Sequence, residues 1–413
     1  MAMIISARGA AVALLNATLG TGAMLGETPV PDGLSGPDRA RAERLAADVL
    51  RQLDRADRIL KPLLRKAPPL AVLNVLRLAV VERAQGAAAY GVVNEAVGMV
   101  RAHNRTQHMA GLVNAVLRAL PETIDLDAMP PPLMPRWLRQ PLVHAWGRDA
   151  VAAVEAIHTR TPPIDITPKP GATDLPEGVR LPNGSLRLVA GGQITSLPGF
   201  AAGDWWVQDA AASMAVPLLA PDPGMRVLDL CAAPGGKTMQ LAALGAHVTA
   251  LDISGPRMTR VRENLARTGL SADLIVADAV HWESDAGFDA ILLDAPCSAS
   301  GTIRRHPDLP HIKDGTELAA LLPLQAALLD RALGLLAPGG RLVYCTCSLL
   351  AAEGEDQISA ALDRHPGLRV EAPQISGIDP AWVTPGGSLR LRPDYWADIG
   401  GMDGFFMARL TRD

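Results

Sequence analysis

Aromatic residues are scarce in this sequence, where Phe, Trp and Tyr together make up 3% of the 413 residues. A hydrophobic core must therefore rest on Leu, Val and Ala, and apolar residues at 48% supply enough material for a globular protein. The sequence has no run of about 18 uncharged apolar residues, so it predicts no membrane span. At this length we expect two or three domains.

Cysteine is also rare and unevenly placed. The four cysteines, Cys231, Cys297, Cys345 and Cys347, all lie in the second half of the chain. They form no Cys-x-x-Cys pair and no Cys/His cluster with zinc spacing, so we expect no metal site. A disulfide framework would not concentrate them in this way, which favours free thiols in a reducing compartment and a cytoplasmic protein. Thiols beside Gly-rich turns are candidates for chemistry.

The chain as a whole lacks the positive charge that is usual for a nucleic-acid-binding protein, since its net charge is −4. The first 121 residues nevertheless contain 15 Lys or Arg and 9 Asp or Glu, which leaves −10 for the remainder. A basic first domain joined to an acidic second one fits RNA binding on one side and catalysis on the other. The same arginines could also simply solvate helix faces.

Hydrophobic spacing divides the chain into regions of different character. Over residues 38–120 apolar residues recur every three or four positions, which predicts an all-α region. Residues 121–136 are Pro-rich and predict a linker, and a mixed region follows to about residue 200. From Arg226 onwards short apolar strands alternate with helices. We therefore predict a helical domain over 1–125, a small α+β subdomain over 126–205 and a Rossmann-like α/β domain over 206–413.

Five short strands are expected in the last domain. They end at Leu230, Leu251, Ala277, Leu293 and Cys345. Repeated strand–helix units predict a parallel sheet with helices on both faces. Because ligands bind beyond the carboxyl ends of the strands in such sheets, the residues that follow these strands form the candidate site.

The first strand runs into Asp-Leu-Cys-Ala-Ala-Pro-Gly-Gly-Lys-Thr, residues 229–238. Small residues let the backbone approach a ligand closely, and the N terminus of the next helix offers free N–H groups. A P-loop would need glycine where this chain has Cys231, and the loop also lacks the Gly-x-Gly-x-x-Gly pattern of dinucleotide-binding proteins. By itself the loop could be no more than a tight turn.

Acidic residues follow the second and third strands at Asp252 and Asp278. A carboxylate at the first of these places can accept hydrogen bonds from both ribose hydroxyls of a nucleoside, and the second is placed to meet an adenine. Aspartate is also a common cap and strand-terminating residue, so either one alone means little. Three successive strands that end in Asp around a small-residue loop favour a nucleoside cofactor.

Two cysteines follow the fourth and fifth strands. Cys297 lies in Asp-Ala-Pro-Cys-Ser, which begins at Asp294, and Cys347 lies in Tyr-Cys-Thr-Cys-Ser. Cys345 is one step inside the strand and is expected to be buried. A thiolate that adds to C6 of cytosine makes C5 able to accept a methyl group, and Asp294 could hydrogen-bond the ring nitrogen. These residues alone leave open which thiol attacks.

Together the blocks resemble the Sun-type, RsmB-like RNA cytosine-5 methyltransferases, which have Cys-Ala-Ala-Pro-Gly-Gly-Lys-Thr, Asp-Ala-Pro-Cys-Ser and Thr-Cys-Ser in this order. The similarity covers about residues 131–413. It implies S-adenosylmethionine as cofactor, bound by Cys231, Ala232, Ala233, Pro234, Gly235, Gly236, Lys237, Asp252, Asp278 and Asp294. It also implies Cys347 as nucleophile and Cys297 as the residue that assists release. DNA cytosine-5 methyltransferases use the cysteine of a Pro-Cys pair, which would select Cys297 instead.

The helical region is similar to the NusB RNA-binding fold at residues 92–97 and 111–118. Fused to this catalytic core, it implies a substrate cytosine in 16S ribosomal RNA, free or in an early small-subunit particle. We expect a cytoplasmic monomer with no membrane partner. Segment 164–168 departs from the family pattern, because it lacks the Arg and Asn that are usual at this place.

Two other functions fit the sequence less well. An RNA-binding protein that had lost its chemistry should show gaps at the cysteines, at Asp294 and at Lys237, and all of these residues are present. A small-molecule methyltransferase would need neither the basic helical domain nor the two cysteines.

Overall fold

The structure is a computed structural model that describes residues 6–189 and 192–412, so the first five residues of the predicted helical domain lie outside the described residues. The chain forms two compact units. The first contains Met1–Thr161 together with Ile303–Asp314, and the second contains Pro162–Thr302 and Gly315–Asp413. The chain therefore leaves the second unit after Thr302 and returns to it at Gly315. The three domains expected from the sequence, over residues 1–125, 126–205 and 206–413, stay a prediction.

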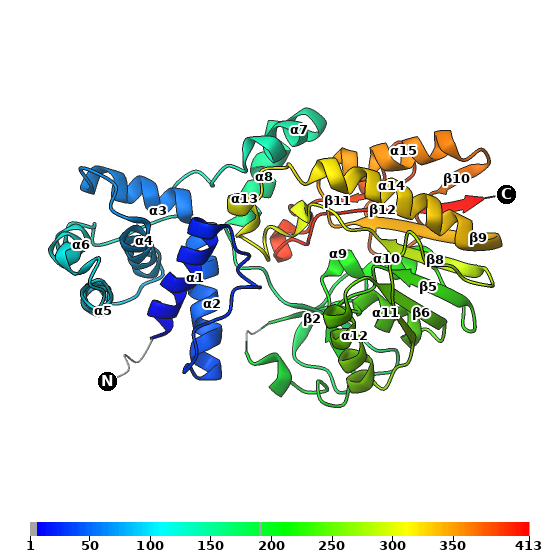
Figure 1. The fold of residues 1–413 in the computed structure, drawn as a ribbon, viewed down its shortest axis with the longest axis horizontal. Helices are drawn as coiled ribbons and strands as arrows, with labels where there is room; N and C mark the ends of the chain where they lie inside the picture. Colours follow the sequence, from blue (N-terminus) through cyan, green and yellow to red (C-terminus); the bar gives the residue numbers. More distant parts are fainter. Residues whose placement is uncertain (1–5, 190–191, 413) are drawn as a thin grey trace. The chain divides into compact units, whose positions relative to one another are not determined.

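The regular elements of the first unit are all helices among its described residues (Figure 1), as the apolar spacing of three and four predicts for residues 38–120. Its helices are α1 (Ala7–Thr21), α2 (Gly36–Arg51), α3 (Leu53–Leu60), α4 (Leu70–Ala84), α5 (Ala89–Arg101), α6 (Ala110–Arg118), α7 (Arg136–Trp146), α8 (Arg148–His158) and α13 (Leu309–Ile312). Val49, Leu76 and Val113 are fully buried in one shared core. The Ser6 side chain begins α1 by accepting a hydrogen bond from the Gly9 N–H, which satisfies an amide that the helix itself leaves unpaired.

Segment Ile303–Asp314, which carries α13, packs within the helical unit. The carboxylate of Asp308 accepts a hydrogen bond from Leu25 N at 2.8 Å. Arg51 Nη2 donates to the Arg304 carbonyl at 3.0 Å, and the Arg304 side chain is buried. A stretch that follows β8 (Phe288–Asp294) of the second unit in sequence thus belongs structurally to the first, helical unit.

The second unit is built on an eight-stranded sheet. Its strands are β5 (Arg226–Leu230), β6 (His247–Asp252), β7 (Asp273–Val276), β8 (Phe288–Asp294), β9 (Leu336–Thr346), β10 (Leu368–Glu371), β11 (Leu389–Leu391) and β12 (Phe405–Arg412). The strand order is β10-β12-β9-β8-β5-β6-β7, with β11 paired to β12. The five predicted strands, β5 to β9, are parallel as expected.

The prediction of a parallel sheet is wrong at one edge. Strand β12 runs antiparallel to β9, and both β10 and β11 run antiparallel to β12. Parallel neighbours require a long crossover, usually a helix. The chain goes from β11 to β12 without an α-helix between them, so β12 enters the sheet in the opposite direction.

Helices cover both faces of this sheet (Figure 1). On one face α14 (Leu318–Leu335) and α15 (Glu355–Arg364) pack against Leu228, Ile291 and Tyr344. On the other face α9 (Ala210–Ser213), α10 (Ala215–Leu219) and α11 (Gly236–Ala243) pack against neighbouring strand residues such as Val227 and Leu292. Helix α12 (Gly255–Thr268) lies beside α11 over β6 and β7. Successive strand residues alternate between two cores, as in any sheet that is buried on both faces.

By length and composition α14 could cross a membrane. However, Leu328, Leu329 and Leu333 lie in the core against the sheet, and Gln325 donates a hydrogen bond to the Pro296 carbonyl at 2.9 Å. These contacts identify α14 as a core helix of the second unit.

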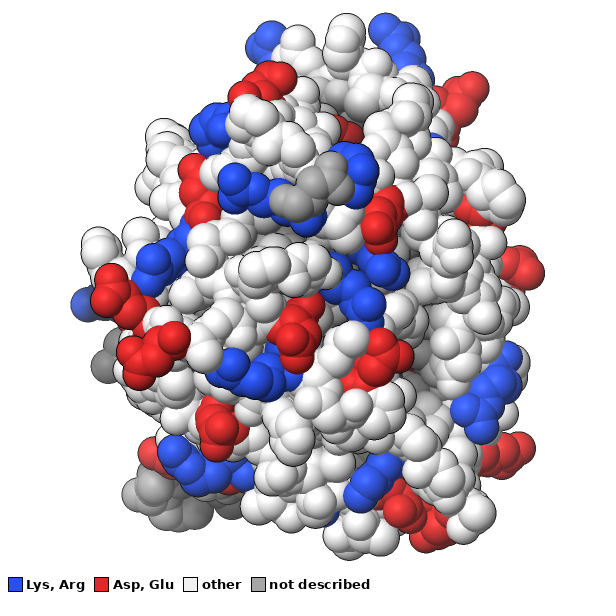
Figure 2. Space-filling view, turned by 90° about the vertical axis from the view of Figure 1, so that its right-hand side faces the viewer, with Lys and Arg blue, Asp and Glu red and all other residues white. Residues whose placement is uncertain are grey.

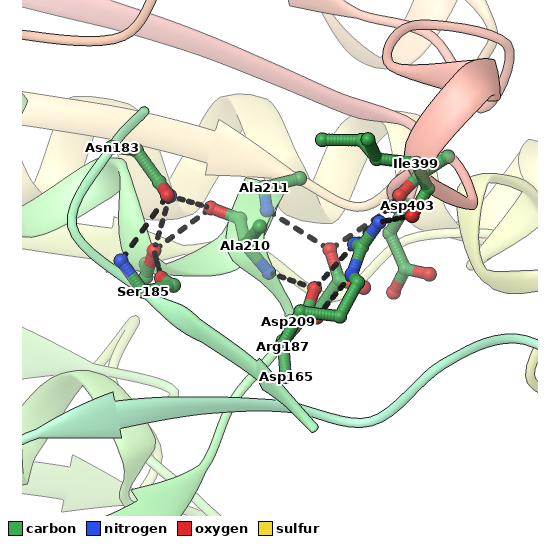
Figure 3. A network of polar contacts seen from close by, with 11 residues as sticks. Asp165, Asn183, Ser185, Arg187, Asp209, Ala210, Ala211, Ile399 and Asp403 are labelled. Atoms are coloured by element: carbon green, nitrogen blue, oxygen red, sulfur yellow. Dashed lines mark hydrogen bonds and ion pairs between the residues drawn. The ribbon is translucent and has the colours of Figure 1, made fainter. Parts of the chain in front are cut away.

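A smaller antiparallel sheet precedes α9 in the second unit. Its strands β1 (Asp165–Pro168), β2 (Gly178–Arg180), β3 (Leu186–Leu188) and β4 (Trp205–Val207) have the order β2-β3-β1-β4. Asp165 accepts hydrogen bonds from Nε and Nη2 of Arg187 at 2.7 and 2.8 Å (Figure 3). Arg187 also donates to the carbonyls of Ile399 and Gly401, and Ala210 N donates to Asp165. Segment 164–168, which departs from the family pattern, thus contributes a buried ion pair that fixes the small sheet to the start of α9.

Candidate active site

The small-residue loop lies between the end of β5 and the start of α11, as predicted. Cys231 and Gly235 adopt positive φ angles of 61° and 99°, and a side chain at position 235 would meet Val261 at 3.1 Å. Glycine at this place lets the loop pass close to α12 without a clash. Burial raises the pKa of Cys231 to about 12, so this thiol is not a nucleophile.

Asp229 lies at the end of β5 and is completely buried. Its Oδ2 accepts a hydrogen bond from Thr238 Oγ1 at 2.5 Å, but its Oδ1 has no hydrogen-bond partner among the described residues. A buried acceptor without a partner costs about 1–3 kcal/mol. The ammonium group of S-adenosylmethionine would supply donors here, so the loop fits the cofactor that the family resemblance implies.

The burial of Asp229 has a consequence for stability. Burial raises the pKa of Asp229 from 3.8 to about 7, so the folded protein holds this proton more tightly than the unfolded chain. The resulting stabilisation is complete below pH 3.8 and is lost as the pH rises through about 7. The side-chain amide of the Asp229→Asn variant would not titrate. The Tm of the wild type minus the Tm of Asp229→Asn should therefore fall between about pH 4 and about pH 8 in cofactor-free protein. Parallel Tm curves for the two proteins would contradict this assignment.

Two further predicted carboxylates lie at the same edge of the sheet. Asp252, at the end of β6, is buried and accepts hydrogen bonds from Ala233 N at 3.2 Å and Ser254 N at 2.9 Å. It thereby fixes the loop and keeps lone pairs for a ligand hydroxyl. Asp278 lies two residues beyond β7, with its side chain 45% exposed, and a hydrogen bond with His281 lowers its pKa. An ionised carboxylate at this exposed position can accept hydrogen bonds.

Lys237 and Asp294 form an ion pair that joins the loop to the end of β8. Lys237 Nζ lies 2.7 Å from Asp294 Oδ2 and 5.1 Å from the centre of the Phe405 ring. Burial by itself would lower the pKa of Lys237, but nearby negative groups, Asp294 first among them, outweigh it and the pKa is raised. The thiol of Cys345, buried as predicted, donates to Asp294 Oδ1 at 3.5 Å. Asp294 is therefore held by two buried side chains.

The two candidate thiols lie side by side. Cys297 Sγ and Cys347 Sγ are 3.5 Å apart, although 50 residues separate them in the sequence. Backbone contacts fix this approach, because Gly301 N donates to the Cys347 carbonyl at 2.9 Å. The hydrogen bond with Cys347, followed by burial, raises the pKa of Cys297 well above its ordinary value. A thiol that keeps its proton is a poor nucleophile, so the raised pKa disfavours attack by Cys297.

The structure also brings to the site residues that the sequence analysis missed. One of them is Glu353, which is completely buried and whose carboxylate accepts hydrogen bonds from Ser298 and Ser348. The sequence carries one signal of such a residue, because a serine follows the cysteine in both blocks, at Ser298 and Ser348. Two hydroxyls next to the two thiols can share one buried acceptor.

Two observations concern the surroundings of the site. Among the described residues no group of three or more His, Cys, Asp or Glu side chains gathers in a way that could hold a metal ion. On the face drawn in Figure 2, Lys and Arg side chains are interspersed with Asp and Glu. RNA binding relies on clustered cations, so the coloured residues of this face offer no continuous basic surface for it.

Comparison with known proteins gives consistent matches. A family model described as 16S rRNA methyltransferase RsmB/F matches residues 216–411, and the NusB family model matches residues 6–122. The chain is similar to ribosomal RNA small subunit methyltransferase B of Cronobacter sakazakii, with 36% identity over 93% of each chain. The protein of that name from Pseudomonas syringae pv. tomato is 39% identical over 73% of this chain and 72% of its own. The crystal structure of a methyltransferase homologue from Pyrococcus horikoshii is 30% identical, with a TM-score of 0.55, over 67% of this chain and 94% of that one.

Proposed function

Since the chain belongs to the RsmB/F family of 16S rRNA methyltransferases, we propose that it methylates C5 of a cytosine in 16S ribosomal RNA through a covalent bond from Cys347 to C6. It is an S-adenosylmethionine-dependent enzyme with a NusB-like RNA-binding unit. The observation that carries the covalent route is the pair of thiols 3.5 Å apart at the carboxyl ends of β8 and β9. Methylation of an exocyclic amine or a ribose hydroxyl would need no thiol.

The chemistry begins with the thiolate of Cys347, which adds to C6 and pushes the electron pair of the C5–C6 double bond towards the ring nitrogen. That nitrogen becomes more basic and takes up a proton from solvent, and the carboxylate of Asp294, held by Lys237, would accept a hydrogen bond from the resulting N–H. When bound, S-adenosylmethionine would supply an electrophilic methyl group to C5. Residues 231–237 with Asp252, Asp278 and Asp294 would hold this cofactor. Small residues and fixed carboxylates at one sheet edge suit this task.

Release reverses the addition. A base removes the C5 proton, the electron pair restores the C5–C6 double bond, and the bond from C6 to Cys347 breaks. The thiol of Cys297 keeps its proton and lies 3.5 Å from Cys347 Sγ, so it can hydrogen-bond the departing thiolate. This contact gives Cys297 its role in assisting release.

The same proposal covers partners and location. The NusB-like unit would bind 16S ribosomal RNA, free or in an early small-subunit particle, and a monomer in the cytoplasm would suffice. The C5 and C6 atoms of cytosine are hidden within an RNA helix. The target should therefore be single-stranded or flipped out of the stack.

The identity of the product tests this function. Wild-type protein is incubated with unmodified 16S ribosomal RNA and S-adenosylmethionine, and the RNA is digested to nucleosides for mass spectrometry with authentic standards. We expect 5-methylcytidine, located by bisulfite sequencing. N4-methylcytidine, 2′-O-methylcytidine or a methylated purine as the product would refute the C5 assignment while leaving the family membership intact.

A further inference from the structure

We propose that Glu353 is a positioning residue that holds Cys297 and Cys347 at their working separation. The proposal rests on the proposed function, which gives the two thiols their roles. Glu353 lies in the short 3-10 helix η5 (Ala351–Glu353), beyond β9, and is completely buried. It is placed to act through the two loops and not on the substrate.

The contacts of its carboxylate reach both cysteine blocks. Oε1 accepts from Ser298 N at 2.8 Å, and Oε2 accepts from Ser298 Oγ at 2.5 Å. Oε2 also accepts from Ser348 Oγ at 2.5 Å. Ser298 follows Cys297 directly and Ser348 follows Cys347 directly. One carboxylate therefore joins the residues next to both thiols.

Other hydrogen bonds fix the position of Glu353 itself. Gln325, on α14, donates to Oε1 at 3.0 Å and to the Pro296 carbonyl at 2.9 Å, one residue before Cys297. The Glu353 carbonyl accepts from Tyr344 Oη at 3.0 Å and from Thr346 Oγ1 at 3.2 Å, both on β9. Side chain and backbone are thus tied to the helix and strand on either side of the thiols. A fully satisfied buried network of this kind rigidifies the groups that it connects.

The charge of Glu353 matters as well as its shape. Among the described residues it forms no ion pair with Lys or Arg, and four hydrogen-bond donors surround its two oxygens instead. Two of these donors are serine hydroxyls that both lie 2.5 Å from the same carboxylate oxygen, Oε2. After the Cys347 hydrogen bond and burial, the negative charge of Glu353 also helps to raise the pKa of Cys297.

Kinetics of substituted enzymes give the first test. Glu353→Ala should lower kcat by about 100-fold or more, because a misplacement of about 1 Å can cost that much. KM for S-adenosylmethionine should change by less than about threefold, since the cofactor loop is untouched. Glu353→Gln keeps one acceptor oxygen, and its amide can donate to the serine hydroxyls, so kcat should fall by only about tenfold.

A matched control separates this effect from the loss of any buried acid. Glu155 is 1% exposed, lies on α8 in the helical unit and accepts hydrogen bonds from Met134 N and Arg139. Glu155→Gln should leave kcat within about twofold of wild type. Equal losses of kcat in Glu353→Gln and Glu155→Gln would overturn the positioning role.

A second readout measures the thiol separation without any reaction on RNA. Diamide should oxidise Cys297 and Cys347 of the wild type to an intramolecular disulfide, detected by peptide mass spectrometry, because the sulfurs are 3.5 Å apart. Formation should be at least about tenfold slower in Glu353→Ala and at least about threefold slower in Glu353→Gln. An unchanged rate in a folded variant would overturn the proposal, and the glutamine variant decides if the alanine variant does not fold. Slower oxidation beside a product other than 5-methylcytidine would refute the proposed function and leave the placement of Glu353 standing.

Discussion

Replacing Cys347 by alanine should lower the rate of methyl transfer to 16S ribosomal RNA by about 10⁴-fold or more. C5 of cytosine is a poor nucleophile, and without the thiolate no adduct forms that could activate it. Cys297 is not expected to replace the missing thiolate, because burial and the nearby charge of Glu353 still raise its pKa when the contribution of Cys347 is gone. The measurement is incorporation of a radioactive methyl group in single-turnover experiments.

Binding serves as the control for this variant. The removal of one thiol at the end of β9 leaves the helical unit and the loop 231–237 unchanged, so affinities for RNA and cofactor should stay within about twofold of wild type. A residual rate above about one hundredth of wild type would mean that Cys347 is not the nucleophile.

Asp294→Asn should reduce kcat by about 100- to 1000-fold, which is the cost of losing one strong transition-state hydrogen bond. The substitution keeps the size of the side chain but removes the charge that pairs with Lys237 Nζ at 2.7 Å. It also leaves a buried cation without its counter-ion, so affinity for S-adenosylmethionine should fall as well.

Strand β8 provides a control at its opposite end. Asp289 accepts a hydrogen bond from Arg226 N at 2.8 Å and is exposed. Asp289→Asn should leave kcat within about twofold of wild type. If Asp294→Asn were as active as Asp289→Asn, Asp294 would have no part in the chemistry.

The parts of the fold that sequence could predict are those with a strong local signal. Strands β5 and β8 and the last part of β9 are short apolar runs between helices. Asp229, Asp294 and Cys347, at or just beyond the ends of these strands, gather at one sheet edge because parallel strands end there. The antiparallel edge escaped prediction because β10 and β11 are three or four residues long and carry little periodicity. The packing of Ile303–Asp314 in the helical unit depends on distant partners such as Leu25, which no local pattern encodes.

In the site, too, residues with a local sequence signal could be predicted and residues that depend on distant partners could not. Cysteines and carboxylates directly after strands could be selected by residue type and position. Glu353 could not, because it lies in a short 3-10 helix six residues after Cys347, and only the folded chain brings it to Ser298. Asp278 was expected at the end of a strand and lies two residues beyond β7, since the strand stops at Val276.

Trapping of the covalent RNA adduct tests the central claim most directly. Cys297→Ala and Cys347→Ala proteins are mixed separately with unmodified 16S ribosomal RNA and S-adenosylmethionine, and the mixtures are run on a denaturing gel. We expect a denaturation-resistant protein–RNA band with Cys297→Ala alone, because release is impaired there while Cys347 can still attack, and the RNA should map to the Cys347 peptide. A band with Cys347→Ala alone would contradict this mechanism and make Cys297 the nucleophile.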